Sequence, residues 1–146
     1  MISVRKVRVA VILFNAEDSV LLCRQNNRPF WVLPGGTLEP DETVLDCAVR
    51  ELKEEANLDI CVKQLVGLSD FLRAEQPQAL DITCFAELIG GELQMTQDEN
   101  LNEIGFFTQE QVHTMPIKPD YAKDLLLTHW NNKNFPQSCY LYEAPQ

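Results

Sequence analysis

Residues 35–58 read GGTLEPDETVLDCAVRELKEEANL, and they contain the strongest pattern in this chain of 146 residues. The stretch opens on two glycines, Gly35 and Gly36, and ends in a run of charged side chains. Residues 40–42, Pro-Asp-Glu, predict the start of a helix, because acids are favoured where the helix dipole is positive. Asn57 predicts the end of that helix, since asparagine tolerates the left-handed conformation that terminates many helices.

The predicted helix has an apolar stripe with acids beside it. A helix turns by about 100° per residue, which assigns each side chain to a face. The apolar residues that we expect to pack on a sheet are Leu45, Ala48, Val49, Leu52 and Ala56. Glu51, Glu54 and Glu55 lie next to this stripe, and the repulsion between Glu51 and Glu55, four residues apart, destabilises the bare helix. A hard cation such as Mg²⁺ would remove that conflict, so the pattern predicts a metal site; the alternative is a solvated acidic surface.

The spacing of these residues resembles the Nudix box, G-x5-E-x7-R-E-U-x-E-E-x-G-U, where U is a bulky aliphatic residue. The matching positions are Gly36, Glu42, Arg50, Glu51, Leu52, Glu54, Glu55 and Leu58. The second glycine is replaced by Asn57, which also accepts a left-handed helix end. The chain is therefore similar to the Nudix hydrolases. This resemblance implies an α/β/α sandwich around a mixed sheet, and Mg²⁺-dependent cleavage of a nucleoside diphosphate linked to another moiety.

The rest of the chain alternates in a way that is typical of strands. We expect strands at 4–14, 20–24, 60–71, 79–89 and 103–107, and shorter ones at 30–33 and 92–95. Gly90 and Gly91 predict a hairpin turn into the last of these. Helices are expected at 109–113, capped by Thr108, and from a cap at Asp120 to about 131. The chain is thus predicted to be a single domain, 1–146, of the α/β or α+β class. Its tail from about 132 is expected to add a strand, to cover a sheet edge or to meet a partner chain.

Composition narrows the functional classes. The formal charge of −10 argues against a groove for a nucleic-acid duplex, although bound cations would still permit a nucleotide substrate. No apolar run approaches a membrane span, and residues 1–9 lack the apolar core of a signal peptide. The five cysteines contain no CxxC pair, which suits free thiols in a reducing compartment. We therefore expect a cytoplasmic protein without membrane contact.

Within the box, each charged residue has an expected role. Three carboxylates are predicted to hold one or more Mg²⁺ ions, or alternatively Mn²⁺: Glu51, Glu54 and Glu55. The resemblance implies that the carbonyl oxygen of Gly35 joins them. Arg50 has a rigid donor fork, so we expect it to orient a glutamate and keep it ionised. Glu42 either contributes to the same electrostatics or only caps the helix.

The general base and the substrate contacts are less defined. Glu54 or Glu55 could act as the base, and the resemblance also points to Glu99 in the acidic loop 96–102; its alternative is a solvated surface acid. Gly36, Arg24 and Trp31 are candidates for substrate binding. For Trp31 we favour core packing over stacking on a base. Other arginines that could reach a phosphate, although each alone is typical of a surface charge, are Arg28 and Arg73.

Two functional hypotheses remain at this stage. The first is a hydrolase acting on a nucleoside triphosphate or on a nucleotide sugar such as ADP-ribose. The second is a Nudix-like sensor module that binds a nucleotide without cleaving it. All four acids of the box and Arg50 are present, which favours catalysis. A homodimer is expected only by analogy with relatives.

Overall fold

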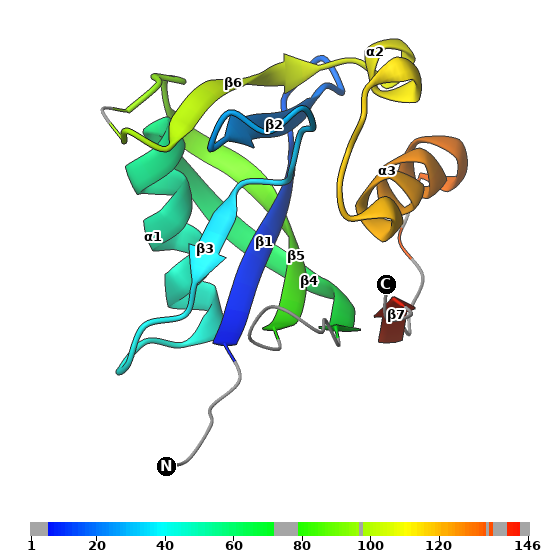
Figure 1. The fold of residues 1–146 in the computed structure, drawn as a ribbon. Helices are drawn as coiled ribbons and strands as arrows, with labels where there is room; N and C mark the ends of the chain where they lie inside the picture. The colour runs from blue at the N-terminus through cyan, green and yellow to red at the C-terminus, as the bar shows by residue number, and fades with distance from the viewer. Residues whose placement is uncertain (1–5, 72–78, 97, 134, 136–139, 144–146) are drawn as a thin grey trace.

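The computed structural model describes residues 6–71, 79–96, 98–133, 135 and 140–143 (Figure 1). The described elements are β1 (Lys6–Phe14), β2 (Val20–Gln25), β3 (Gly35–Thr37), α1 (Val44–Ala56), β4 (Leu58–Phe71), β5 (Ala79–Gly91), β6 (Leu101–Phe107), α2 (Gln109–Thr114), α3 (Asp120–Asn132) and β7 (Tyr140–Glu143). The strands form one sheet in the order β6-β2-β1-β5-β4-β7, and β3 pairs with β1 off this path. Strands β1 and β5 are parallel, as are β4 and β7, while the other pairs are antiparallel. The predicted mixed sheet is therefore confirmed.

Helices cover both faces of the sheet (Figure 1). On one face, Val9, Val11 and Leu13 of β1 pack with the buried side of α1. On the other face, Ile12 of β1 packs with buried residues of α2 and α3. Alternate residues of a strand point to opposite faces, so this central strand contributes to both cores. The result is the expected α/β/α sandwich.

Strand β1 changes partner along its length, and this creates the space for the glycine loop. It pairs with β2 only at its end, through Phe14 and Val20, and with β3 near its start. The connecting chain fills the gap between β1 and β2: the Val11 N–H donates to the Pro34 carbonyl at 2.9 Å, and Cys23 bridges to Val32. The strand predicted at 30–33 is therefore wrong. Two isolated bridges replace it, and regular pairing begins at Gly35.

The start of α1 differs from the prediction and its end agrees with it. The N-cap is Thr43, whose hydroxyl accepts from the Asp46 N–H while the Asp46 carboxylate accepts from the Thr43 N–H. This reciprocal capping box outweighs the acidic segment 40–42, in which Asp41 has a φ of 69°. At the other end, Asn57 adopts the expected left-handed conformation with φ 59° and ψ 33°.

We predict that Asn57→Gly leaves the free energy of unfolding within about 1 kcal/mol of the wild type, whereas Asn57→Ala lowers it by about 1–2 kcal/mol. Glycine meets the left-handed conformation without strain, although it loses the bond from Asn57 Nδ2 to the Glu92 carbonyl at 3.0 Å. Alanine has neither the conformational freedom of glycine nor the side-chain hydrogen bond of asparagine. Urea denaturation of the two variants measures the difference. Equal destabilisation by Gly and Ala would show that the side-chain bond, not the conformation, selects asparagine.

The apolar stripe of α1 is narrower than predicted. Ala48, Leu52 and Ala56 are fully buried, but Leu45 and Val49 are 50% and 43% exposed. The helix is rotated so that Cys47 and Glu55 face inward instead. Glu55 is consequently placed inside the protein.

The predicted hairpin at Gly90 and Gly91 is wrong. Strand β5 continues through both glycines, which pair with Asp59 and Leu58, and residues 92–95 form no strand. A Cβ atom on Gly91, which has a φ of 84°, would overlap the Asn57 carbonyl oxygen. The two glycines therefore allow β5 to pass close to the junction between α1 and β4, and they do not form a turn.

From β6 onward, the described elements agree with the prediction except at one cap. Pro119, not Asp120, occupies the N-cap of α3 and makes no side-chain capping bond. Asp120 instead forms an ion pair with Lys118 at 3.0 Å. Strand β7 pairs with β4, so the tail extends the sheet at that edge. The described helices include none that is long and apolar enough to span a bilayer.

Candidate functional site

Glu55 lies at the point where β1 and β2 separate. Its side chain is only 6% exposed, although it is an acid. The Gly35 N–H donates to Glu55 Oε2 at 3.0 Å, and Gln25 Nε2 donates to Glu55 Oε1 at 3.1 Å. Helix α1, strand β3 and strand β2 thus meet at one carboxylate. Gln25 was not predicted as a site residue, because its contact with Glu55 depends on strand pairing.

The surroundings of Glu55 favour its protonated form. Burial raises the pKa of this carboxyl to about 8, and the neighbouring charge of Glu51 acts in the same direction. The Gly35 N–H, the Arg8 guanidinium and the Gln25 amide act in the opposite direction but do not cancel the effect of burial. Near neutral pH this group can therefore take up or release a proton, or accept a cation in place of the proton.

Arg50 organises the other acids of the helix. Its Nε and Nη2 atoms form two hydrogen bonds with Glu42, at 3.0 and 2.7 Å. Its Nη1 atom donates to Glu51 at 3.0 Å and to Glu54 at 3.1 Å. Arg50 therefore makes the contact with the box glutamates that we predicted for it. A planar guanidinium is suited to hold several carboxylates in fixed directions.

The carboxylates around Arg50 differ in their proton affinity. Hydrogen bonds from Arg50 and from the Glu39 N–H lower the pKa of Glu42 to about 2. Burial raises the pKa of Glu51, and Arg50 partly offsets this effect. Glu42 precedes the N-cap residue, so it belongs to the Arg50 cluster and does not cap the helix. Of the two roles expected for Glu42, the electrostatic role fits this geometry and the capping role does not.

The two glycines of this loop, Gly35 and Gly36, allow neighbouring groups to approach the backbone closely. A Cβ atom on Gly35, whose φ is 149°, would overlap the Val9 carbonyl oxygen. A Cβ atom on Gly36 would overlap the Glu51 carboxylate. Any side chain at these positions would push β3 away from β1 or displace Glu51. Coordination by the Gly35 carbonyl and substrate contact by Gly36 stay predictions.

The donor atoms suit a hard cation in their chemistry, but they do not yet converge. Among the described residues, no three His, Cys, Asp or Glu side chains are arranged so that they could hold a metal ion. The Glu51 and Glu54 carboxylates face Arg50, while Glu55 faces Gly35 and Gln25. All the candidate donors are oxygens, which Mg²⁺ prefers, and the buried Glu55 would be stabilised by a positive neighbour. The Glu54 side chain is 60% exposed, so solvent leaves it room to turn away from Arg50.

Glu99 lies in the exposed loop between β5 and β6. Its neighbour Asn100 accepts a hydrogen bond from the Asn26 N–H at 2.8 Å, and Asn26 follows Gln25 in the chain. The loop is therefore attached to the segment that contacts Glu55. The catalytic role of Glu99 stays a prediction.

The candidate substrate residues Arg24 and Trp31 both have partners within the protein. Arg24 donates from Nε and Nη2 to Glu103, at 3.1 and 2.7 Å, so its guanidinium is already engaged. Trp31 packs edge-on against Phe107, with ring centroids 4.8 Å apart, and joins the core under α3, as favoured. Arg28 lies over the ring of Phe30 at 5.8 Å. Arg73 falls outside the described residues.

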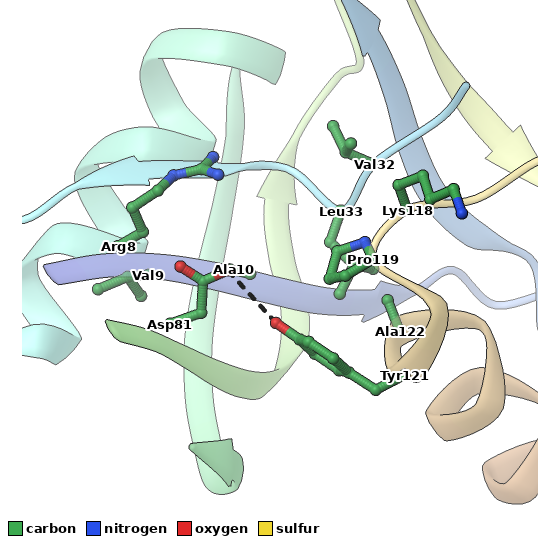
Figure 2. A pocket seen from close by; sticks show the side chains of 10 residues that line it. All are labelled: Arg8, Val9, Ala10, Val32, Leu33, Asp81, Lys118, Pro119, Tyr121 and Ala122. Atoms are coloured by element: carbon green, nitrogen blue, oxygen red, sulfur yellow. Dashed lines mark hydrogen bonds between the residues drawn. The ribbon is translucent and has the colours of Figure 1, made fainter. Parts of the chain in front are cut away.

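Two cavities lie next to each other beside this site. One, of about 200 Å³, is lined by Arg8, Gln25, Asn26, Arg28, Phe30 and Val32. The other, of about 40 Å³, lies between β1 and the start of α3 (Figure 2). Its lining includes Asp81, which accepts a hydrogen bond from the Tyr121 hydroxyl at 3.3 Å. Arg8 and Val32 line both cavities. Arg8 was missed in the sequence because it occupies one position of an alternating strand, which carries no sign of a site.

Comparison with known proteins settles the family. The family model described as the NUDIX domain matches residues 4–130. The chain belongs to the Nudix family. Its fold is shared by a NUDIX hydrolase from Nitrosomonas europaea, with a TM-score of 0.79 and 19% identity over 100% of this chain and 82% of that one.

Two curated relatives match part of the chain. An ADP-ribose pyrophosphatase from Methanocaldococcus jannaschii is 37% identical over 90 residues, which cover 59% of this chain and 53% of that protein. An RNA pyrophosphohydrolase from Pseudomonas fluorescens is 38% identical over 73 residues, which cover 49% and 46%. The chain thus spans about half the length of these curated relatives.

Proposed function

We propose that this Nudix protein is a Mg²⁺-dependent pyrophosphohydrolase that cleaves the diphosphate linkage of a nucleotide derivative. The observation that carries the proposal is the acidic face of α1, on which Arg50 holds Glu51 and Glu54 beside the buried Glu55. Arg50 also binds Glu42, which precedes the helix. A folded protein gains no stability from a buried carboxyl with a raised pKa. Such a group is expected where a cation or a proton has to be bound.

Each residue of the cluster has a role in this proposal. Glu51, Glu54 and Glu55, with the Gly35 carbonyl, would hold one or more cations, which supply charge neutralisation at the phosphoryl oxygens and lower the pKa of a bound water. Arg50 keeps Glu42 ionised and sets the direction of Glu51. The Gly36 position, free of a side chain, leaves room for the Glu51 carboxylate.

The proton from the attacking water needs an acceptor within hydrogen-bond reach. Glu54 and Glu55 are the candidates on the helix, and Glu99 is the candidate outside it. Glu55 has a pKa close to neutral in the protein without a cation, and a cation beside it would lower that pKa and leave it ionised. Glu54 is exposed and can turn toward either a cation or water.

The substrate class follows from the names of the relatives and not from the cavity shapes. The relatives are named as an ADP-ribose pyrophosphatase and an RNA pyrophosphohydrolase, and they match this chain with similar identity. We therefore propose a nucleoside triphosphate or a nucleotide sugar such as ADP-ribose, without preferring one. The expectations of a cytoplasmic location and of a homodimer also remain proposals; the former is supported by the free thiols of the described cysteines Cys23, Cys47, Cys61 and Cys84.

The experiment is a hydrolysis panel of nucleoside triphosphates, ADP-ribose, other nucleotide sugars and dinucleoside polyphosphates, each with Mg²⁺, with Mn²⁺ and with EDTA. We expect release of a nucleoside monophosphate from one class, at least 100-fold faster with metal than with EDTA. Glu110→Gln is a matched control, because Glu110 is an exposed acid on α2. Tight binding of one compound without cleavage under any condition would favour the sensor module over the hydrolase.

A further inference from the structure

The larger of the two cavities adjoins the buried acid. Gln25 lines this cavity and also donates to Glu55, so a ligand in the cavity lies one side chain away from the acidic face of α1. The cavity contains two guanidinium groups, those of Arg8 and Arg28, and no acidic side chain. It is therefore a positively charged hollow beside a negatively charged helix.

The two arginines differ from Arg24 and Arg50 in their contacts. Arg28 lies over the ring of Phe30 at 5.8 Å, and Arg8 acts on Glu55 through its charge. Arg24 is bound to Glu103, and Arg50 is bound to Glu42, Glu51 and Glu54. Within the described ranges, neither the Arg8 nor the Arg28 guanidinium has a carboxylate partner at ion-pair distance. In a protein with a formal charge of −10 and 22 acidic residues, two unpaired arginines facing one cavity are unexpected unless they bind an anion.

The backbone under both arginines is fixed. Arg8 pairs with Thr37 of β3 on one side and with Asp81 of β5 on the other. Arg28 closes a turn in which its N–H donates to the Gln25 carbonyl at 3.0 Å, and its guanidinium rests on Phe30. Binding of an anion would therefore order only the ends of two side chains.

We propose that Arg8 and Arg28 form an anion subsite that holds a substrate phosphate beside the acidic face of α1. Guanidinium groups bind phosphate oxygens through two parallel N–H bonds, and these are among the stronger hydrogen bonds in proteins. The subsite rests on the proposed function, because the two arginines would bind the substrate phosphate that the acidic residues alone would repel. Arg8 is the central residue, because it also lines the smaller cavity toward Asp81 and Lys118 (Figure 2).

The position of Arg8 between the two cavities indicates the form of the ligand. A phosphate held at Arg8 has Gln25, which donates to Glu55, on one side. The smaller cavity, with Leu33, Pro119 and Tyr121 in its lining, lies on the other. The smaller cavity, of about 40 Å³, leaves room for only a few atoms beyond the phosphate. Inorganic phosphate alone would fill only the central part.

The test measures binding of ADP in EDTA by calorimetry, for the wild type and for Arg8→Ala, Arg28→Ala and Arg8→Lys. We expect Arg8→Ala and Arg28→Ala each to weaken ADP binding about tenfold or more, and Arg8→Lys to recover part of the loss, because lysine keeps the charge but not the fork. The matched control is Lys63→Ala, which removes one exposed positive charge paired with Glu87 between β4 and β5. Melting curves of all variants check the fold, and the loop residue Arg28 carries the test if Arg8→Ala is unstable.

In steady-state hydrolysis of the compound identified by the panel, KM should rise by a similar factor while kcat falls by less. Wild-type ADP affinity in both alanine variants, or an equal loss in Lys63→Ala, would overturn the subsite, as would the absence of ADP binding by the wild type. The two proposals fail separately. ADP binding that depends on the arginines, without hydrolysis, would reject the proposed enzyme activity and support the subsite. Hydrolysis that is insensitive to both arginines would support the enzyme activity and reject the subsite.

Discussion

Glu54→Gln and Glu55→Gln are each expected to lower kcat by about two to four orders of magnitude, whichever of the two is the base. Each substitution replaces an ionised oxygen donor by a neutral amide of nearly the same shape. Glu54 is exposed and outside the apolar core, so its loss does not weaken packing. Glu55 is buried, but glutamine can still accept from the Gly35 N–H, so the bond that joins α1 to β3 is kept.

The measurement is turnover at saturating Mg²⁺, with circular dichroism and melting curves to show that both variants fold. Glu110→Gln, with the same chemical change on an exposed turn of α2, should retain wild-type turnover. Turnover within threefold of the wild type in Glu54→Gln and also in Glu55→Gln would contradict the assignment of these residues to metal binding and catalysis. A large loss in one variant only would identify that residue as the essential one.

The parts of the site that lie within one helix could be predicted from the sequence. The contacts of Arg50 with Glu51 and Glu54 join residues one and four positions apart, and the helical repeat fixes such neighbours. Asn57 at the helix end is local in the same sense, because the left-handed conformation depends on the residue itself. The exact start of the helix was missed, because Thr43 provides the cap and the segment 40–42 does not. The width of the apolar stripe was also missed, since Leu45 and Val49 are exposed.

The contacts between strands could not be predicted, because they depend on register. Gln25 reaches Glu55 only because β1 leaves β2 and the glycine loop fills the gap. Arg8 gains its place between two cavities from its pairing with Thr37 and Asp81, which are distant in the chain. A shift of one residue in this pairing would move Arg8 to the other face of the sheet.

The same limit explains the error at Gly90 and Gly91. A glycine pair between two apolar segments is the local signal of a hairpin, and nothing in residues 79–95 argues against it. The structure instead uses Gly91 where β5 passes the end of α1, since a side chain there would overlap the Asn57 carbonyl. Local turn chemistry and close approach between elements select the same residue, so the sequence alone does not separate them.

Glu55→Gln is also expected to make the protein without metal more stable, and by an amount that grows with pH. The pKa of Glu55 is raised to about 8 in the folded protein and returns to its ordinary value near 4.5 on unfolding. Below pH 4.5 the group is protonated in both states and gives no penalty. Between pH 4.5 and 8 the unfolded chain releases the proton and the folded protein retains it, so the free energy of unfolding falls as the pH rises.

Glutamine does not titrate, so the variant escapes this loss. By pH 8 we expect its free energy of unfolding to exceed that of the wild type by on the order of 3 kcal/mol, and to differ little below pH 4.5. The measurement is urea denaturation of both proteins in EDTA from pH 4 to pH 9. Glu42 has a lowered pKa of about 2, so it contributes stability that is lost as the pH falls from 4.5 toward 2. This contribution is the same in both proteins and cancels in the difference.

Mg²⁺ gives the second arm of this experiment. A cation that binds the folded state at Glu55 stabilises the wild type by mass action, so millimolar Mg²⁺ should raise its melting temperature and raise that of Glu55→Gln much less. A difference between the two proteins that is the same at pH 5 and pH 8 would show that Glu55 is ionised in the fold without any cation. The hydrogen bonds from Gly35 and Gln25 would then be enough to accommodate the buried carboxylate. The case for a cation held at this helix would rest on turnover alone.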